Sequence, residues 1–308
     1  MVKFVFTKAK VPISMKPIML VVLVFFGCTS SDNKKNEQDA NQSNIREKYS
    51  GRDIKNISYG TYPSQIMDLY FPEKNNNGIT IIYIHGGAWY SGDKSESLNW
   101  SRFFQSIGYT FISINYRLSH SAEQNIYPVQ IDDVRKAIDY IKVHADEWGI
   151  DAKNFAIMGA SAGAQLCLLY AYNDNDERNV KVAIALCGIS DLTDTGIVKA
   201  DIGEISGQTM LEWYLGKDAV NNPDLLRKAS PVNYINENSI PTFLIHGKLD
   251  QVVSYVQSLN VAKKLSEFKI PNQLNVLEGI DHDLLAVDLT PQLKKADTFV
   301  QSILKSNK

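Results

Sequence analysis

Three side chains that together can cleave an acyl bond occur in the order serine, aspartate and histidine. Ser161 is the centre of a Gly-Ala-Ser-Ala-Gly turn, Asp250 follows His-Gly-Lys-Leu, and His282 lies in Gly-Ile-Asp-His-Asp. In such a set the histidine takes the serine proton during attack, while the aspartate fixes the histidine tautomer and stabilises the imidazolium. We therefore predict that Ser161, Asp250 and His282 form a catalytic triad that works through an acyl-enzyme.

The segment around Ser161 predicts a strand, a sharp turn and a helix. Residues 155–158 are apolar with strand character, and residues 162–172 have helical character. Gly159 and Gly163 would let the strand and the helix approach closely, where a side chain would collide. This arrangement is typical of a nucleophile elbow, in which the serine oxygen is exposed on a strained backbone.

A second glycine turn, His85-Gly86-Gly87-Ala88-Trp89, follows another buried strand. Such a turn can aim backbone N–H groups at the negative charge that develops on an acyl oxygen. We expect the N–H groups of Gly87 and Ala88, with that of Ala162 at the start of the helix, to form an oxyanion hole. The aromatic rings of Trp89 and Tyr90 are predicted substrate contacts, and Trp213 and Tyr214 are further candidates for the rim.

The competing acids and histidines fit these roles less well. Asp191 follows another predicted strand and is the rival to Asp250. Asp281 and Asp283 flank His282 in sequence and are expected to be solvated. The other histidines are assigned to loop shaping, to the surface or to structural hydrogen bonding: His85, His120, His144 and His246.

Alternating strands and helices must bring these groups together. Predicted strands, of which the most continuous are 79–84, 109–115, 155–158 and 182–186, alternate with predicted helices such as 129–147. This alternation predicts an α/β fold with a mostly parallel sheet and helices on both faces. Ligands of such sheets bind at the carboxyl ends of the strands, where all three candidate side chains fall. Residues 193–240 interrupt this alternation of strands and helices. They are predicted to form a small cap within a domain of residues 51–308.

The N-terminal region has the pattern of an export signal. Four lysines without an acid precede the apolar run 17–27, then Cys28 and a polar tract. The run is too short for a stable membrane span. It resembles a bacterial lipoprotein signal, although Phe25 stands where leucine is usual; plain secretion is the alternative. We expect a signal peptide at 1–28, lipidation of Cys28, a disordered tether at 29–50, and a location in the bacterial cell envelope, anchored to the membrane.

Composition excludes other classes of function. The 308 residues carry a net charge of −2, so no basic field attracts nucleic acid. The spacing of Cys and His does not resemble a metal site, and we predict no metal. Cys167 and Cys187 have apolar neighbours and are read as buried free thiols, with a disulfide between them as the alternative. Composition does not indicate the oligomeric state.

The combined motifs resemble one family. His-Gly-Gly-Ala-Trp, Asn115-Tyr116-Arg117, Gly-Ala-Ser-Ala-Gly-Ala and His-Gly-x-x-Asp are similar to those of α/β-hydrolases of the hormone-sensitive-lipase-like and feruloyl-esterase-like group. Ala88 and Ala164 replace glycines that many relatives carry. The resemblance implies hydrolysis of carboxylic esters without a cofactor, and a buried structural ion pair between Arg117 and Asp133.

The resemblance leaves several activities open. The leading hypothesis is a serine carboxylesterase for short-acyl or aryl esters, including acetylated or feruloylated carbohydrate. The His-Gly-Gly-x-Trp form also resembles kynurenine formamidases, so an arylformamidase is the alternative. A serine peptidase, and a non-catalytic binding protein on the same scaffold, are the remaining hypotheses.

Overall fold

The structure is a computed structural model that describes residues 44–199, 201–202 and 205–305. The predicted signal peptide, Cys28 and residues 29–43 of the predicted tether lie outside the described residues. In the described residues no helix has the length and apolar character that crossing a membrane requires.

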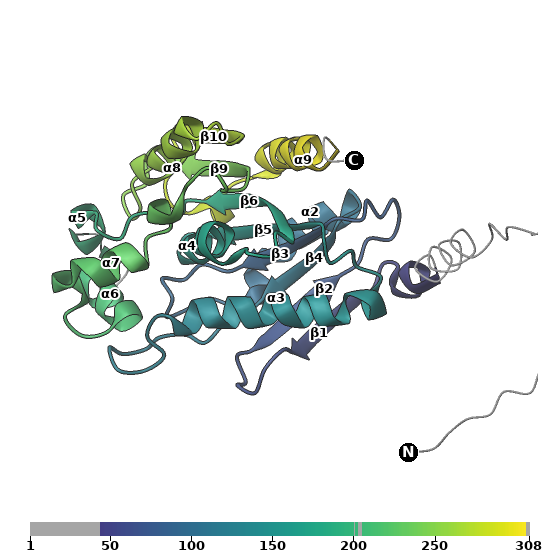
Figure 1. Ribbon diagram of the computed structural model, residues 1–308, viewed down its shortest axis with the longest axis horizontal. Helices are drawn as coiled ribbons and strands as arrows, with labels where there is room; N and C mark the ends of the chain where they lie inside the picture. Colours follow the sequence, from purple (N-terminus) through teal and green to yellow (C-terminus); the bar gives the residue numbers. More distant parts are fainter. Residues whose placement is uncertain (1–43, 200, 203–204, 306–308) are drawn as a thin grey trace, which may run out of the picture. The chain divides into compact units, whose positions relative to one another are not determined.

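An eight-stranded sheet runs through the domain (Figure 1). The first two strands along the chain are antiparallel to their neighbours, and the remaining strands are parallel. The strands, in the order of the sheet, are β1 (Asp53–Ser58), β2 (Ile66–Tyr70), β4 (Thr110–Ile114), β3 (Thr80–Ile84), β5 (Phe155–Ala160), β6 (Val180–Leu186), β9 (Thr242–Gly247) and β10 (Asn272–Leu277). The predicted mostly parallel α/β sheet is confirmed.

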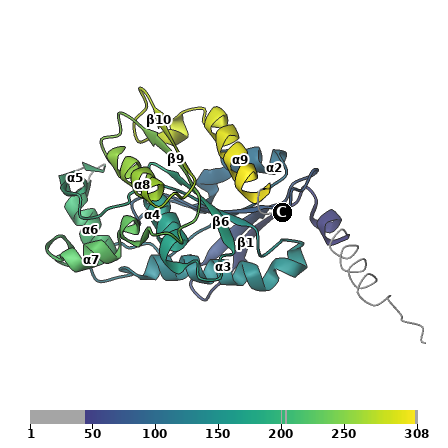
Figure 2. The same cartoon turned by 45° about the horizontal axis from the view of Figure 1, so that its top comes forward.

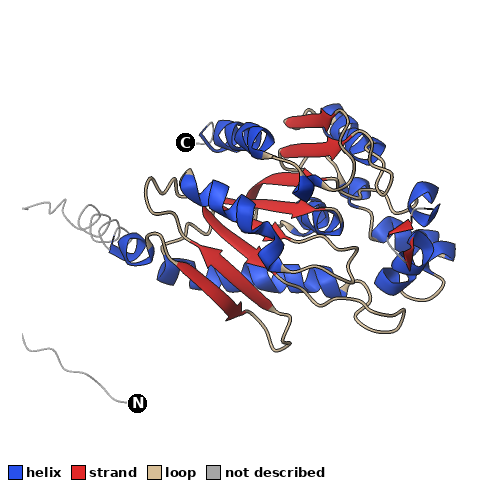
Figure 3. Ribbon diagram, turned by 180° about the vertical axis from the view of Figure 1, so that it is seen from behind, coloured by secondary structure: helices blue, strands red, loops and turns tan. Residues whose placement is uncertain are grey.

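Helices cover both faces of this sheet (Figure 2). On one face lie α3 (Val129–Trp148), α4 (Ala162–Leu169) and α8 (Val256–Glu267), and on the other lie α2 (Leu98–Ser106) and α9 (Thr290–Lys305). Every residue of β3 and β4 is buried, as expected for strands covered on both sides. The view from behind in Figure 3 shows the strands passing between the two helical layers.

Shorter elements shape the ends of the strands. They are the single turns η1 (Lys94–Ser97), η3 (Ala219–Asn221), η4 (Pro231–Tyr234) and η5 (Leu284–Ala286), and the π-helical η2 (Tyr170–Asp174). The insertion between β6 and β9 contains α5 (Thr195–Lys199), a small hairpin of β7 (Asp201–Ile202) and β8 (Ile205–Ser206), α6 (Gly207–Leu215) and α7 (Pro223–Lys228). These elements occupy the region that the sequence predicts as a cap.

The ordered domain begins earlier than predicted. Residues 44–49 form a helical turn, although the sequence predicts a disordered tether as far as residue 50. The ring of Tyr49 is buried and stacks on Phe71 at a centroid distance of 5.0 Å. Arg46 Nε donates to the carbonyl of Gly149, 3.3 Å away. The tether prediction is therefore wrong for these residues, because one aromatic contact and one hydrogen bond fix them to the domain.

A buried ion pair fixes the loop after β4 to α3. Arg117 Nη2 lies 2.6 Å from Oδ1 of Asp133, whose side chain is fully buried. Gln65 Nε2 donates to the same oxygen at 2.6 Å. Among the described residues, the hydrogen bonds of this pair do not involve Ser161. This geometry agrees with the structural role that the resemblance implies for Arg117 and Asp133.

Candidate active site

Ser161 occupies a strained position between β5 and α4. Its backbone angles are φ 53° and ψ −119°, in a region that L-residues rarely adopt. A Cβ on Gly159 would lie 2.3 Å from the carbonyl oxygen of Gly163, and one on Gly163 would lie 2.2 Å from that of His85. Glycine is therefore required at both positions, since any side chain would push the helix away from the strands.

His282 reaches Ser161 from the loop after β10. Its Nε2 lies 3.0 Å from Ser161 Oγ, and its Nδ1 lies 2.6 Å from Oδ2 of Asp250. The three residues follow the ends of β5, β9 and β10. In the sheet β9 and β10 are adjacent, and β6 separates β5 from β9. The structure thus brings together all three residues that the sequence selects for the triad.

The Asp250 carboxylate is buried, and both of its oxygens accept hydrogen bonds. Its Oδ1 accepts from the N–H groups of Val252 and Val253 at 2.9 and 2.8 Å. Burial raises its pKa, but hydrogen bonds from His246 and His282 outweigh this and hold the pKa well below its usual value. Asp250 is therefore ionised over the whole neutral range, as a partner for an imidazolium should be.

His246 contacts the same carboxylate oxygen as His282. Its Nε2 lies 2.8 Å from the carbonyl oxygen of Val253 and 3.2 Å from Oδ2 of Asp250. Its Nδ1 lies 2.7 Å from Ser258 Oγ. A carbonyl can only accept, so Nε2 carries the proton and Nδ1 accepts from the serine hydroxyl. The structural role predicted for His246 is thus a specific one, which is to orient Asp250.

The rival groups lie in other environments. Asp191 Oδ1 accepts from the N–H and the hydroxyl of Thr193, and none of its hydrogen bonds in the described residues reaches His282. His85 is buried against the ring of Tyr116, and burial lowers its pKa to about 4. His120 is exposed. His144 lies on α3 between the rings of Tyr140 and Trp148.

The predicted oxyanion hole lies beside Ser161. Gly87 and Ala88 have φ angles of 96° and 50°, and both line the cavity that contains Ser161. Among the hydrogen bonds of the described residues, none uses the N–H of either residue. Ala162 is the first residue of α4, so its N–H has no partner within the helix. None of the three N–H groups therefore has a hydrogen-bond partner among the described residues, and the oxyanion hole stays a prediction.

The cavity at Ser161 has a volume of about 300 Å³. Ser161, His282 and the glycine turn line it. The other lining residues include Tyr83 and Leu186 of the sheet, Glu96 of η1, Trp100 of α2 and Leu284 of η5. The space is large enough for a small acyl or aryl group but short for a long acyl chain.

Tyr90 lines this cavity, whereas Trp89 does not. Trp89 is fully buried, its ring stacks on Tyr214 at 4.0 Å, and its Nε1 donates to Gln165 at 3.1 Å. The prediction that Trp89 contacts substrate is therefore wrong, because the cap covers it. Tyr214 is buried in the same stack, while Trp213 packs edge-on against Tyr90.

Comparison with known proteins agrees with this architecture. A family model described as BD-FAE matches residues 67–265, which is almost two thirds of the chain. The chain belongs to the BD-FAE family. This membership confirms the resemblance to α/β-hydrolases of the feruloyl-esterase-like group, since the matched residues include the elbow and the glycine turn.

Several relatives of this BD-FAE chain are esterases. It is 29% identical to Esterase LipQ of Mycobacterium tuberculosis over 58% of the chain and 43% of LipQ. It is also 29% identical to the probable carboxylic ester hydrolase LipM of the same organism, over 79% of the chain and 58% of LipM. The chain thus spans about half the length of these two relatives. With the ethyl acetate hydrolase of Pseudomonas putida it shares 26% identity over 70% of each protein.

Solved structures show the same fold. A truncated carbohydrate esterase from gut microbiota superimposes with a TM-score of 0.69 at 21% identity, covering 83% of this chain and 98% of that one. Esterase B from Lactobacillus rhamnosis gives a TM-score of 0.67 at 20% identity, covering 90% and 93%. These neighbours confirm the α/β-hydrolase fold of the BD-FAE chain.

Sequence reasoning missed a cysteine beside the triad. Cys187 has a φ of 45°, and its Sγ, an oxygen of Asp250 and a nitrogen of His282 all lie within 4.8 Å of one another. Burial and the charge of Asp250 raise the pKa of the thiol, so it stays protonated and does not compete with Ser161 as nucleophile. Cys187 and Cys167 are both free, which excludes a disulfide between them in this structure.

Proposed function

We propose that this protein is a serine carboxylesterase. The observation that carries the proposal is the continuous path from Ser161 Oγ to His282 Nε2, 3.0 Å, and from His282 Nδ1 to Asp250, 2.6 Å, at the end of a cavity. These are hydrogen-bond distances, so proton transfer from serine to imidazole needs no rearrangement. The esterase activity of the relatives supports the same assignment.

The reaction follows from this geometry. Ser161 attacks the acyl carbon as His282 takes its proton, and Asp250 stabilises the imidazolium. The oxyanion accepts hydrogen bonds from the N–H groups of Gly87, Ala88 and Ala162; one such donor is typically worth about 3 kcal/mol in the transition state. The imidazolium then protonates the leaving alcohol, and a water molecule activated by His282 releases the acid from the acyl-enzyme.

The cavity favours short-acyl or aryl esters. A volume of about 300 Å³ with aromatic walls suits an acetyl or an aryl group better than a long acyl chain. Two proteins of similar structure are a carbohydrate esterase and an acetyl ester-xyloside bifunctional hydrolase. We therefore place acetylated or arylated carbohydrate among the substrates of this protein.

Hydrolysis of phenyl acetate and labelling by a fluorophosphonate probe test the proposal. Wild type should hydrolyse the ester and take up the probe, while Ser161→Ala should lose about 10⁴–10⁶ in rate and all labelling. N-formylkynurenine and a long-chain ester serve as competing substrates. A preference for the formamide of tenfold or more would move the assignment to an arylformamidase, and the absence of both hydrolysis and labelling in wild type would reject an enzyme of this class.

Attachment to the bacterial membrane through Cys28 forms part of the proposal. The basic start, the apolar run 17–27 and the following cysteine support it. Replacement Cys28→Ser should release the protein from the membrane fraction or block its processing, with Cys167→Ser as a control that leaves fractionation unchanged. Mass spectrometry that finds an unmodified mature start at another residue would overturn this assignment.

A further inference from the structure

The cavity at Ser161 is lined by a carboxylate that the triad does not use. Glu96 lines it together with Tyr83, Trp100, Leu186 and Leu284, and Glu96 is itself exposed. Asp283 is a second carboxylate of the lining, and in the described residues no Lys or Arg side chain lines the cavity. A carboxylate at the wall of the cavity accepts hydrogen bonds from hydroxyl groups and repels other carboxylates.

Hydrogen bonds at the start of η1 fix the position of Glu96. Its Oε1 accepts from the N–H of Asp93 at 3.0 Å, while Asp93 Oδ1 accepts from the N–H of Ser95 at 2.9 Å. This reciprocal pair is a capping box. Asn115 Nδ2 donates to the other oxygen of Asp93 at 2.7 Å. Among the hydrogen bonds of the described residues none uses Oε2 of Glu96, so this oxygen is available to a ligand.

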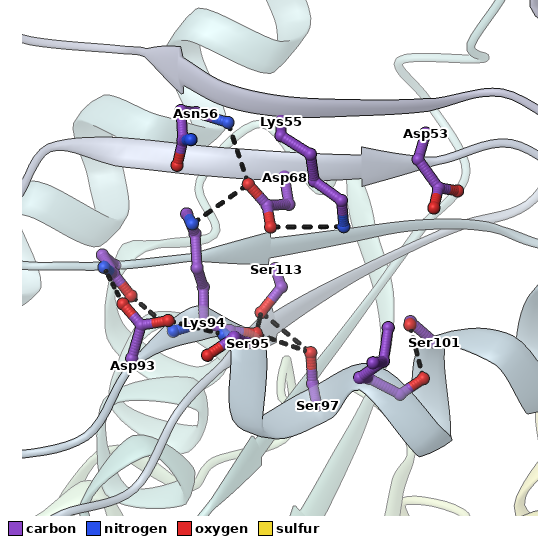
Figure 4. A network of polar contacts seen from close by, with 12 residues as sticks. Asp53, Lys55, Asn56, Asp68, Asp93, Lys94, Ser95, Ser97, Ser101 and Ser113 are labelled. Carbon is purple, nitrogen blue, oxygen red and sulfur yellow. Dashed lines mark hydrogen bonds and ion pairs between the residues drawn. The ribbon is translucent and has the colours of Figure 1, made fainter.

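A buried ion pair holds the same turn against the sheet (Figure 4). Lys94 and Asp68 are both buried, with 3.1 Å between Nζ and Oδ1. The carbonyl of Lys94 accepts from the hydroxyls of Ser97 and Ser113 at 2.9 and 2.7 Å. The backbone that carries Glu96 is therefore fixed from both sides, which preorganises the carboxylate.

Tyr83 adds another polar group to this cavity. Its ring is buried edge-on against Trp100 at 5.4 Å, and none of the hydrogen bonds among the described residues uses its hydroxyl. Burial, and next the charge of Glu96, raise the pKa of Tyr83 far above its usual value. The phenol is therefore neutral and can donate or accept one hydrogen bond. An acceptor and a donor–acceptor thus line one cavity.

We propose that Glu96 and Tyr83 determine specificity, by binding a neutral hydroxyl-bearing group of the ester and excluding groups that carry a carboxylate. The inference rests on the proposed esterase function and names the chemistry of its substrate. A hydroxyl can donate to Oε2 of Glu96 and bond to the phenol of Tyr83, and the ring to which it is attached can pack on Trp100. The hydroxyl can belong to a phenolic acyl group or to a sugar alcohol.

Two matched substrate series test this inference and separate the two sources. The acyl series is methyl cinnamate with a 4-hydroxyl, a 4-carboxylate or no substituent. The alcohol series is an acetylated methyl xyloside and the corresponding acetylated methyl glucuronide, which carries a carboxylate. In wild type we expect kcat/KM to favour the hydroxylated over the carboxylated member in at least one series. Members that are not hydrolysed are measured as competitive inhibitors of phenyl acetate hydrolysis.

Glu96→Gln is the decisive variant because glutamine also completes a capping box and so preserves the turn. It should reduce the preference for hydroxylated over carboxylated members by about tenfold, the size expected for one hydrogen bond to a charged group. Hydrolysis of phenyl acetate, which carries neither group, is measured for every variant as the reference rate. Tyr83→Phe should weaken only the hydroxylated member. Glu237→Gln, which removes an exposed charge outside the cavity, is the matched control.

The outcomes distinguish the two proposals. A changed preference in the cinnamate series assigns Glu96 to binding of the acyl group, and a change in the sugar series assigns it to binding of the alcohol; either supports the inference. An unchanged preference in Glu96→Gln, or no reaction and no inhibition by any member, overturns it while phenyl acetate hydrolysis persists. Failure of wild type to hydrolyse phenyl acetate would instead overturn the proposed function.

Discussion

The Nε2 atom of His246 lies 3.2 Å from Oδ2 of Asp250, the oxygen that also binds His282. Because Ser258 and the Val253 carbonyl fix the His246 ring, the ring in turn fixes the carboxylate. Two imidazoles therefore share one oxygen, one as a support and the other as the proton acceptor of the reaction.

Replacing His246 should slow catalysis without weakening substrate binding. His246→Ala removes a hydrogen bond to Asp250 and lets the carboxylate shift, so kcat should fall by about 10–100-fold. KM should stay the same, since His246 does not line the cavity. His246→Gln, whose amide can donate to the same oxygen, should recover part of kcat. Steady-state kinetics that show a rise in KM instead would contradict this role.

The choice between the two acids can be tested directly. Asp250→Asn keeps the shape of the side chain but favours the wrong histidine tautomer, and it should cost up to about 10⁴ in kcat. Asp191→Asn should have a far smaller effect, because Asp191 bonds to Thr193 and not to His282. Phenyl acetate hydrolysis by both variants, with circular dichroism to verify folding, provides the comparison. The reverse order of effects would reassign the acid.

The lowered pKa of Asp250 predicts a dependence of stability on pH. An acid whose pKa is lower in the folded chain stabilises the fold above its unfolded pKa, about 3.9 for aspartate. This contribution is lost as the pH falls through the folded pKa. The free energy of unfolding of wild type should therefore fall more steeply than that of Asp250→Asn between about pH 5 and pH 2. Urea unfolding at several pH values measures both slopes, and parallel slopes would contradict the prediction.

Strain at Ser161 should be visible in stability. A residue held in this backbone region costs about 1–3 kcal/mol, while glycine loses about 0.5–1 kcal/mol through its greater freedom in the unfolded chain. Ser161→Gly should therefore be more stable than Ser161→Ala by about 1 kcal/mol, although both are inactive. Alanine keeps the strain and is the matched control. Equal urea midpoints for the two variants would mean that the turn is not strained.

The ion pair between Lys94 and Asp68 should contribute to stability because both groups are buried. Breaking a buried pair typically costs about 3–5 kcal/mol. Asp68 keeps Lys55 at 3.3 Å and the N–H of Asn56 at 2.9 Å, so we expect Lys94→Met to cost about 2–3 kcal/mol. Lys248→Met, which breaks the exposed pair with Glu278, is the control and should change stability little.

Local pattern was sufficient to predict the sheet and the positions of the triad. Apolar runs mark the buried strands, and parallel strands end at one edge, so side chains that directly follow them must meet. Cys187 directly follows β6 and carries the same mark, although its role beside the triad was not recognised. Glu96 carries no such mark, because its place in the cavity depends on how η1 packs. Trp89 follows the glycine turn and was expected at the rim, but Tyr214 of the cap lies distant in sequence and buries it.

The close contact of Gly163 with the His85 carbonyl has an evolutionary consequence. The backbones of the elbow and of the oxyanion turn are in close contact, so a change in the shape of one would displace the other. Glu96, in contrast, belongs to a four-residue turn that is also held by the Asp93 side chain and by the ion pair between Lys94 and Asp68, so the turn does not depend on the Glu96 carboxylate alone. Descendants of this chain can therefore acquire new substrates by single replacements in that turn, while the machinery for breaking the bond is inherited intact.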